Sequence, residues 1–72
     1  MKAYKRRMIQ EFNEVNCRFK KLDKMLHEYR LNKLDFEPTC SYGLLSKQHD
    51  AMEEYLDCLK DRAILEGIEL EY

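Results

Sequence analysis

Basic and aromatic side chains gather at the very start of the chain, where they could bind an anion. Lys2, Tyr4, Lys5, Arg6 and Arg7 all lie within the first seven residues. Lysine and arginine donate charge-assisted hydrogen bonds to phosphate, and an aromatic ring can stack on a base. Cations at a helix start are unfavourable by about 0.3–1 kcal/mol each, and a bound anion would relieve that cost. The alternative interpretation is a solvated basic helix end.

Arg62 is the cation of the second half of the chain that could join this group. In an antiparallel hairpin that turns near residue 36, residues whose numbers add up to about 73 lie side by side. Arg62 then falls beside Glu11, where an ion pair at the edge of the core would fix the register. Alternatively, Arg62 joins the first turn at the open end of the hairpin. With a symmetry mate, such a group would form a basic pocket with aromatic walls.

The residue types needed for catalysis are present, but their arrangement does not indicate an active site. Neither Cys17 nor Cys58 has a base partner in the pattern, and His27 and His49 stand alone without ligand spacing around them. The acidic residues in 53–57 form a face without a metal motif. We therefore expect no enzymatic activity, no metal site and no cofactor.

Charge is distributed unevenly along the chain. The net charge is −1, but residues 1–33 hold ten Lys or Arg against four Asp or Glu, and residues 34–72 hold three against ten. Two segments of opposite charge are expected to pack antiparallel. Because the total is slightly negative and no long basic face is present, we expect no binding to duplex DNA.

Size and composition indicate one small helical domain over residues 1–72. The chain is 44% hydrophobic and 38% charged, with two glycines and one proline. No apolar stretch is long enough for a membrane span or a secretion signal. The three cysteines are an odd number without C-x-x-C spacing, as expected for free thiols in a reducing compartment. We therefore expect a cytoplasmic protein without a membrane partner.

An apolar stripe predicts a first helix over about residues 3–31. Its members recur in alternating steps of four and three, which average the 3.5-residue period of a coiled coil. They are Met8, Phe12, Val15, Phe19, Leu22, Leu26 and Tyr29. No Ser, Thr, Asp or Asn stands at the start of this helix as a cap, so its first turn is intrinsically weak.

Turn-forming residues predict a connection over residues 32–40 around the single proline. Leu34 and Phe36 are expected to fold under the end of the hairpin as an apolar plug. Either Thr39 or Ser41 can cap the helix that follows. A connection this short forces the two helices to run antiparallel.

The second helix is predicted over about residues 41–66, and Gly67 is expected to end it in the left-handed conformation with Ile68 making the accompanying apolar contact. Residues 67–72 are expected to form a loose acidic tail that begins at this cap. The predicted seam of the second helix contains two polar members and is made of Leu45, Gln48, Met52, Tyr55, Leu59 and Arg62. The predicted flanks are Leu44, Ala51, Cys58 and Leu65 on one side and Leu56 and Ala63 on the other.

A single hairpin of this size has little core, so we expect it to associate with copies of itself. Each buried apolar side chain contributes about 1.5–3 kcal/mol. Ordering the backbone costs about 1–2 kcal/mol per residue, which one stripe per helix scarcely offsets. The expected fold is therefore an all-α, antiparallel two-helix hairpin that assembles into a homo-oligomeric helical bundle. A twofold dimer forming a four-helix bundle is the simplest solution, and a trimer or larger ring is the alternative.

Several positions together resemble a family of small helical phage proteins, found in crAss-like phages and in phages of Gram-positive bacteria. The matching positions cover nearly the whole chain: Tyr4, Arg7, Ile9, Glu11, Lys21, Leu22, the connection 34–40, Leu44, Leu45, Gln48, Ala51, Met52, Tyr55, Leu59 and Arg62. The chain departs from the family pattern at Ser41, where a proline is common. The resemblance implies a helical hairpin encoded by an accessory phage gene.

Small non-enzymatic phage proteins of this kind often counter host immunity, which suggests two mechanisms by analogy. The first is a sponge, in which basic pockets between subunits sequester a cyclic or linear nucleotide signal in the host cytoplasm. Its ligand-binding residues would be Tyr4, Lys5, Arg6, Arg7 and Arg62. The second is an inhibitor that lays a charged helix face on a host defence protein. A structural role in the phage is a third and weaker alternative.

Overall fold

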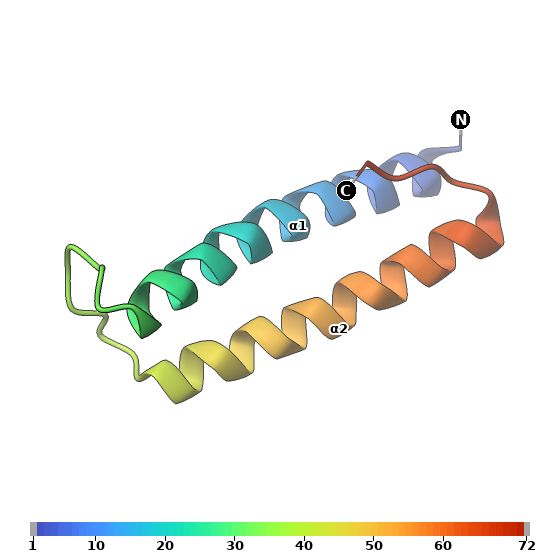
Figure 1. Cartoon of the computed structure of the whole chain (residues 1–72). Coiled ribbons are helices and arrows are strands. Elements are labelled where there is room, and N and C mark those ends of the chain that lie inside the picture. The colour runs from blue at the N-terminus through green and yellow to red at the C-terminus, as the bar shows by residue number, and fades with distance from the viewer. Residues whose placement is uncertain (1, 72) are drawn as a thin grey trace.

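The computed structural model describes residues 2–71, which form two antiparallel helices joined by one connection (Figure 1). Helix α1 spans Ala3–Arg30 and α2 spans Tyr42–Glu66. The predicted all-α hairpin is thus confirmed, and both helices end within one residue of their predicted bounds. The hairpin is elongated, with Cα extents of 45 × 18 × 17 Å. Met1 and Tyr72, the ends of the predicted domain and tail, lie outside the described residues.

The helix ends follow the capping chemistry of the sequence. Of the two possible caps of α2, Ser41 is the one used: its hydroxyl accepts a hydrogen bond from the Leu44 N–H at 3.2 Å. Gly67 ends the same helix with φ +66°. The Ile68 N–H then donates to the Ala63 carbonyl at 2.8 Å, the bond that closes a left-handed cap. As predicted, the residue before α1, Lys2, forms no side-chain cap.

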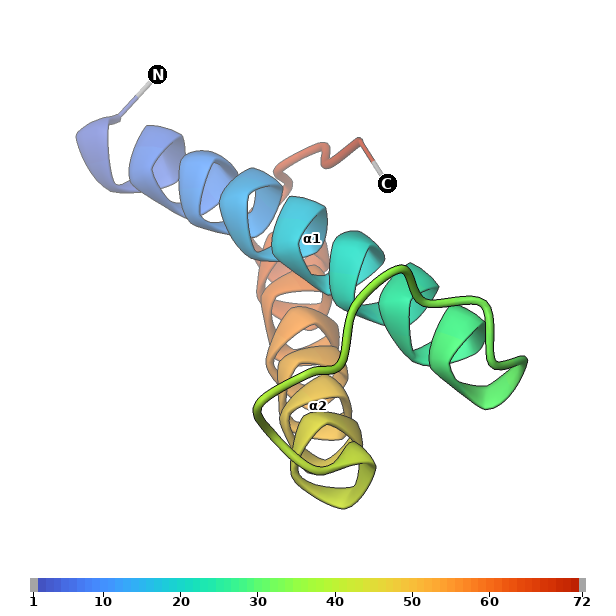
Figure 2. The same ribbon diagram turned by 90° about the vertical axis from the view of Figure 1, so that its left-hand side faces the viewer.

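The core lies where the first half of α1 meets the second half of α2. It is made of Met8, Phe12, Val15, Leu56, Leu59 and Ala63. In Figure 2 the two helices cross instead of running side by side along their whole length. Along the stripe of α1, Phe12 is fully buried and Leu26 is buried, whereas Leu22 between them is only half-buried. The stripe predicted on α1 faces α2 as expected.

The seam predicted on α2 is wrong in its polar half. Gln48, Tyr55 and Arg62 are exposed. The stripe that faces α1 also has four-three spacing and consists of Leu45, His49, Met52, Leu56, Leu59 and Ala63. A second stripe with the same spacing, offset by one residue, runs along α2 through Gln48, Tyr55 and Arg62. The more apolar stripe is buried, because burying the Gln48 amide and the Arg62 guanidinium without partners costs free energy.

Two further predictions are corrected at the ends of the hairpin. Leu34 is half-buried, but Phe36 is 58% exposed and does not plug the end of the hairpin. The acidic tail is not loose throughout, because Ile68 and Leu70 both pack against the core. Figure 1 shows this segment turning back from α2 toward α1. Two crossing helices leave one side of their core open, and these alternate apolar side chains cover part of it.

Candidate functional site

The start of α1 and the end of α2 lie at the same end of the hairpin, which brings the predicted site residues into one region (Figure 1). Lys5 makes the direct connection: its Nζ donates to the Glu66 carbonyl oxygen at 3.4 Å. The last turn of α2 contains no basic residue of its own. Lys5 therefore supplies the positive charge that the carboxyl end of a helix dipole favours. Its first role is structural.

The other first-turn side chains point to solvent. Tyr4 is 40% exposed. Arg6 and Arg7 are exposed and form no ion pair within residues 2–71. No acidic residue stands in the first turn of α1, and no side chain caps it. Arg6 and Arg7 are therefore available to bind an anion, beside an uncapped helix start.

Arg62 lies on α2, one turn before Glu66, and so at the same end as the basic first turn. It is exposed and forms no ion pair with Glu11 among the described residues. The predicted ion pair at the core edge is therefore wrong. The antiparallel register itself is close to the prediction, because the numbers of contacting residues such as Asp23 and His49 or Tyr29 and Tyr42 add up to 71 or 72.

Glu66 has a carboxylate oxygen in this region whose hydrogen-bonding capacity is not satisfied within residues 2–71. One of its carboxylate oxygens, Oε2, is buried and has no hydrogen-bond partner among the described residues. A buried acceptor without a donor costs about 1–3 kcal/mol. A donor from a bound molecule or from a second copy would remove this cost. Its negative charge also limits how anionic a ligand this end accepts beside Lys5.

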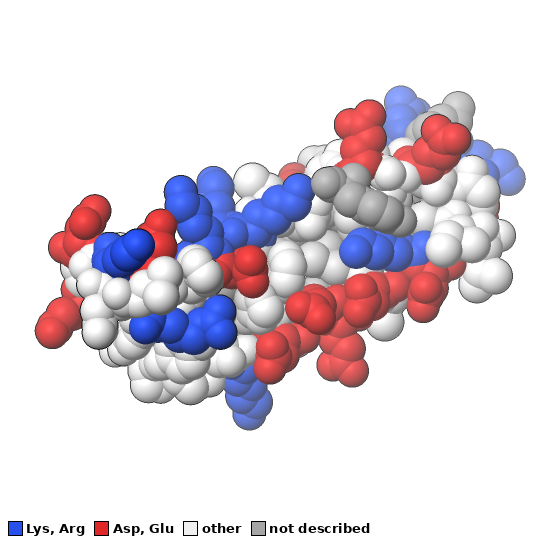
Figure 3. Space-filling view, in the orientation of Figure 1, with Lys and Arg blue, Asp and Glu red and all other residues white. Residues whose placement is uncertain are grey.

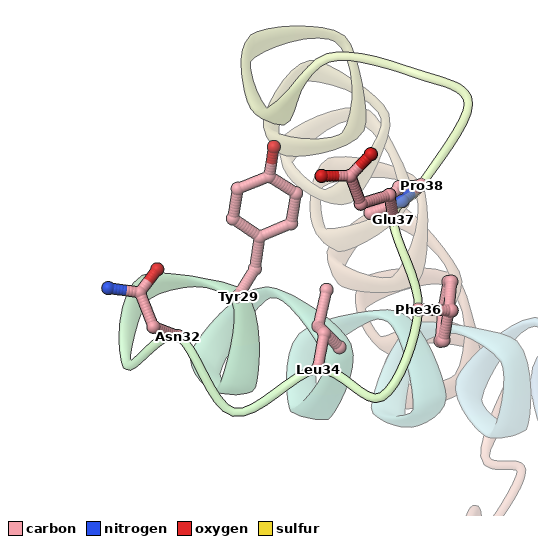
Figure 4. A pocket seen from close by; sticks show the side chains of 6 residues that line it. All are labelled: Tyr29, Asn32, Leu34, Phe36, Glu37 and Pro38. Carbon is pink, nitrogen blue, oxygen red and sulfur yellow. The ribbon is translucent and has the colours of Figure 1, made fainter.

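Two surface hollows lie away from the basic end. The first, of about 410 Å³, sits at the connection and is lined by Tyr29, Asn32, Leu34, Phe36, Glu37 and Pro38 (Figure 4). Among the described residues that line it, Glu37 is the only charged one, so this hollow is not suited to phosphate. The second, of about 390 Å³, is a depression along α1 that includes Arg18 and Lys21. Arg18 is already paired with Glu14 at 3.7 Å. Neither hollow contains a predicted site residue.

His49 forms the best-defined polar cluster of the hairpin, and the sequence pattern missed it. Its ring stacks on Phe19 with centroids 4.6 Å apart. Its Nε2 lies 2.8 Å from Asp23 Oδ1, and its Nδ1 lies 3.2 Å from Asp50 Oδ1. Partial burial works to lower the pKa of His49, but the hydrogen bonds and negative charges of Asp50 and Asp23 outweigh it and raise the pKa above 6.5.

The prediction that His49 stands alone was therefore wrong. Its place on the four-three stripe with Leu45, Met52 and Leu56 was the signal that could have revealed it. His27, by contrast, is exposed.

Charge is divided between the two helices on the surface. Figure 3 shows acidic side chains gathered along α2, whereas Lys and Arg side chains lie over α1 and at the ends of the molecule. Within residues 2–71, no group of three or more His, Cys, Asp or Glu side chains could hold a metal ion. No helix in the described range is both long and apolar enough to cross a membrane.

The family comparison covers both helices and every predicted site residue. The family model described as Sequestin matches residues 2–65. The chain belongs to the Sequestin family. The name of the Sequestin family indicates sequestration of another molecule. No curated protein and no solved structure matches the chain. The Sequestin match ends before the Gly67 cap and the tail, so both the basic first turn and Arg62 are part of the family region.

Proposed function

We propose that this protein is a phage accessory protein that counters host immunity by sequestering a nucleotide signal in the host cytoplasm. The nucleotide, cyclic or linear, is held in basic pockets between copies of the chain. No chemical step is needed for such a function. Stoichiometric binding lowers the free concentration of the signal, and the extent depends on the dissociation constant and on the amount of protein.

The observation that carries the proposal is the basic first turn of a chain whose family name indicates sequestration. Arg6 and Arg7 are exposed cations without an ion-pair partner in the described residues, and Tyr4 beside them offers a partly exposed ring. Guanidinium groups bind phosphate oxygens in a bidentate manner, and a tyrosine ring can stack on a base. Phosphate and base are two of the three parts of a nucleotide, the third being the sugar.

The remaining residues complete the proposed pocket. Arg62 adds a further exposed cation at the same end of the hairpin. Lys5 stays bound to the Glu66 carbonyl and contributes mainly charge. The buried Oε2 of Glu66 has no donor among residues 2–71, and an amino or hydroxyl group of the nucleotide would satisfy it. In a single copy the side chains of Tyr4, Arg6, Arg7 and Arg62 lie on an open surface, which supports a pocket closed by a second copy.

Thermal shift and calorimetry with a panel of cyclic and linear nucleotides test the proposal. We expect one nucleotide class to raise the melting temperature of the wild-type protein and to bind with a measurable dissociation constant. Arg7→Glu should weaken that binding at least tenfold, because a charge-assisted hydrogen bond contributes about 1.5–3 kcal/mol. Lys24→Glu is the matched control, since Lys24 is an exposed cation of α1 outside the first turn and its substitution changes the net charge equally.

Two results would refute the proposal. The first is that no nucleotide binds the correctly folded wild-type protein. The second is that Arg7→Glu and Lys24→Glu weaken binding to the same extent, because the effect would then come from overall charge and not from the basic first turn. A host protein captured by a chain that binds no nucleotide would favour an inhibitor in place of a sponge.

A further inference from the structure

Helix α2 carries a second stripe that the hairpin leaves uncovered. Its members recur in steps of four and three over three heptads and are Leu44, Gln48, Ala51, Tyr55, Cys58, Arg62 and Leu65. We call these seven residues the outer seam. All of them are exposed, and Leu44, Tyr55 and Leu65 keep 56%, 45% and 86% of their accessible surface.

The outer seam has the features of a helix interface. An alternation of four and three keeps all its members on one face of a supercoiled helix. Five of the seven are apolar or aromatic, whereas a solvated helix face is normally polar. A contiguous exposed apolar face on a small protein marks an interaction site. Helix α2 therefore has two faces suited to helix packing, and α1 covers only one of them.

The sequence of the outer seam is complementary to itself when two copies run antiparallel. In the register that places Tyr55 on the twofold axis, residues whose numbers add up to about 109 or 110 face each other across the interface. Leu44 faces the partner's Leu65, and Ala51 faces the partner's Cys58. Tyr55 lies on the twofold axis and meets the partner's Tyr55. Large apolar or aromatic side chains thus meet at the two ends and at the centre, and the small side chains of Ala51 and Cys58 meet beside the centre.

The polar members of the outer seam also find partners in this arrangement. Gln48 faces the partner's Arg62, so its amide oxygen accepts from one N–H of the guanidinium group, which keeps its other N–H donors for the proposed pocket. At the rim, Lys47 lies near the partner's Asp61, and this pair occurs twice. Glu54 meets the partner's Glu54 near the axis, which is one unfavourable contact against two favourable ones. A parallel pairing would instead place two copies of Arg62 together, which like-charge repulsion disfavours.

We infer that two copies of this chain form an antiparallel twofold dimer through the outer seam of α2. The outer seam lies next to the buried stripe of α2, so the α1 helices flank the new interface and a four-helix bundle results. The existence of this interface does not depend on the proposed function. Only its consequence for the binding pocket rests on that proposed function. Each end of the dimer joins the start of one α2 to the end of the other, where Lys5, Arg6 and Arg7 stand.

Cysteine cross-linking tests this register directly. In a background of Cys17→Ser, Cys40→Ser and Cys58→Ala, the variant Tyr55→Cys places one thiol of each copy on the twofold axis. We expect mild oxidation to convert it almost completely to a covalent dimer. Ile64→Cys in the same background is the matched control, because Ile64 is a 72% exposed apolar residue of α2 outside the outer seam.

Light scattering on the full chain provides a second readout that does not depend on cross-linking. The wild-type protein should have twice the mass of one chain at about 100 μM, and Ala51→Glu should reduce it to one chain by placing a charge in the outer seam. Ile64→Glu should stay dimeric. A wild-type mass of one or three chains, or equal cross-linking of Tyr55→Cys and Ile64→Cys, would overturn the interface.

Different experimental results would refute the dimer interface and the proposed function. If the dimer forms but no nucleotide binds, the outer seam is supported and sequestration of a nucleotide is refuted. If monomeric Ala51→Glu binds the nucleotide as tightly as the wild type, the outer seam is supported, but the pocket does not need a second copy. If the wild-type protein is a monomer that binds a nucleotide, the outer seam is refuted and the binding function stands.

Discussion

The His49 cluster makes the stability of this protein depend on pH in a predictable direction. Protonated His49 interacts with Asp23 at 2.8 Å and with Asp50 at 3.2 Å, and its pKa in the folded chain is raised above 6.5. The folded state therefore binds the proton more tightly than the unfolded state. The stabilisation is complete below about pH 6.5 and is lost as the pH rises through the raised pKa.

The size of this effect follows from the exposure of the groups. The side chain of His49 is 17% exposed, but those of Asp23 and Asp50 are 64% and 76% exposed. Solvent screens each contact strongly, so each is worth about 0.2–1 kcal/mol. We expect the free energy of unfolding to fall by about 1 kcal/mol between about pH 5.5 and pH 8.5. For a domain of this size that corresponds to a melting temperature lower by about 4–8 °C.

Urea denaturation followed by circular dichroism at the two pH values, at one protein concentration, measures the effect. His49→Gln removes the titrating group, so the difference between the two pH values should largely disappear. The stacking on Phe19 is lost at both pH values and does not affect that difference. His27→Gln is the control, because His27 is exposed and its substitution should leave the wild-type pH dependence unchanged.

Four outcomes would refute this reasoning about the cluster. The wild-type protein could be equally stable at both pH values, or more stable at the higher one. His49→Gln could retain the full wild-type pH dependence, or His27→Gln could abolish it. Any of these would contradict the assignment of the pH dependence to protonation of His49 in the folded state. Asp23→Asn should give an intermediate result, since one of the two carboxylates remains.

Three other substitutions test the fold. Ser41→Ala removes the cap of α2 and should reduce the free energy of unfolding in urea by about 1 kcal/mol, whereas Thr39→Ala should change it little; equal effects would contradict the assignment of the cap. Gly67→Ala should cost about 1 kcal/mol because of φ +66°, although no atom would touch the new methyl group, whereas Gly43→Ala in the first turn of α2 should not destabilise. Phe12→Ala should cost about 3–5 kcal/mol and abolish the cooperative helical signal at 25 °C, and a folded variant would contradict its place in the core.

The sequence could predict the helices and their ends because local chemistry fixes them. Ser41 carries a hydroxyl one position before a helical run, and Gly67 is the residue type that adopts positive φ without strain. The apolar stripe of α1 was equally predictable, since Met8, Phe12, Val15 and Leu26 are apolar residues at coiled-coil spacing. The basic first turn was visible as a run of cations.

The sequence by itself determined that two amphipathic helices form and that one end of the first is basic. Only the tertiary structure decided which of two equally spaced stripes of α2 is buried, because that choice depends both on how the helices cross and on the free-energy cost of burying Gln48 and Arg62 without partners. Crossing placed His49 between Phe19, Asp23 and Asp50, left the outer seam exposed, and turned Lys5 toward the Glu66 carbonyl. Spacing along one helix shows which residues share a face, but the direction of that face is set by the contacts with its neighbours.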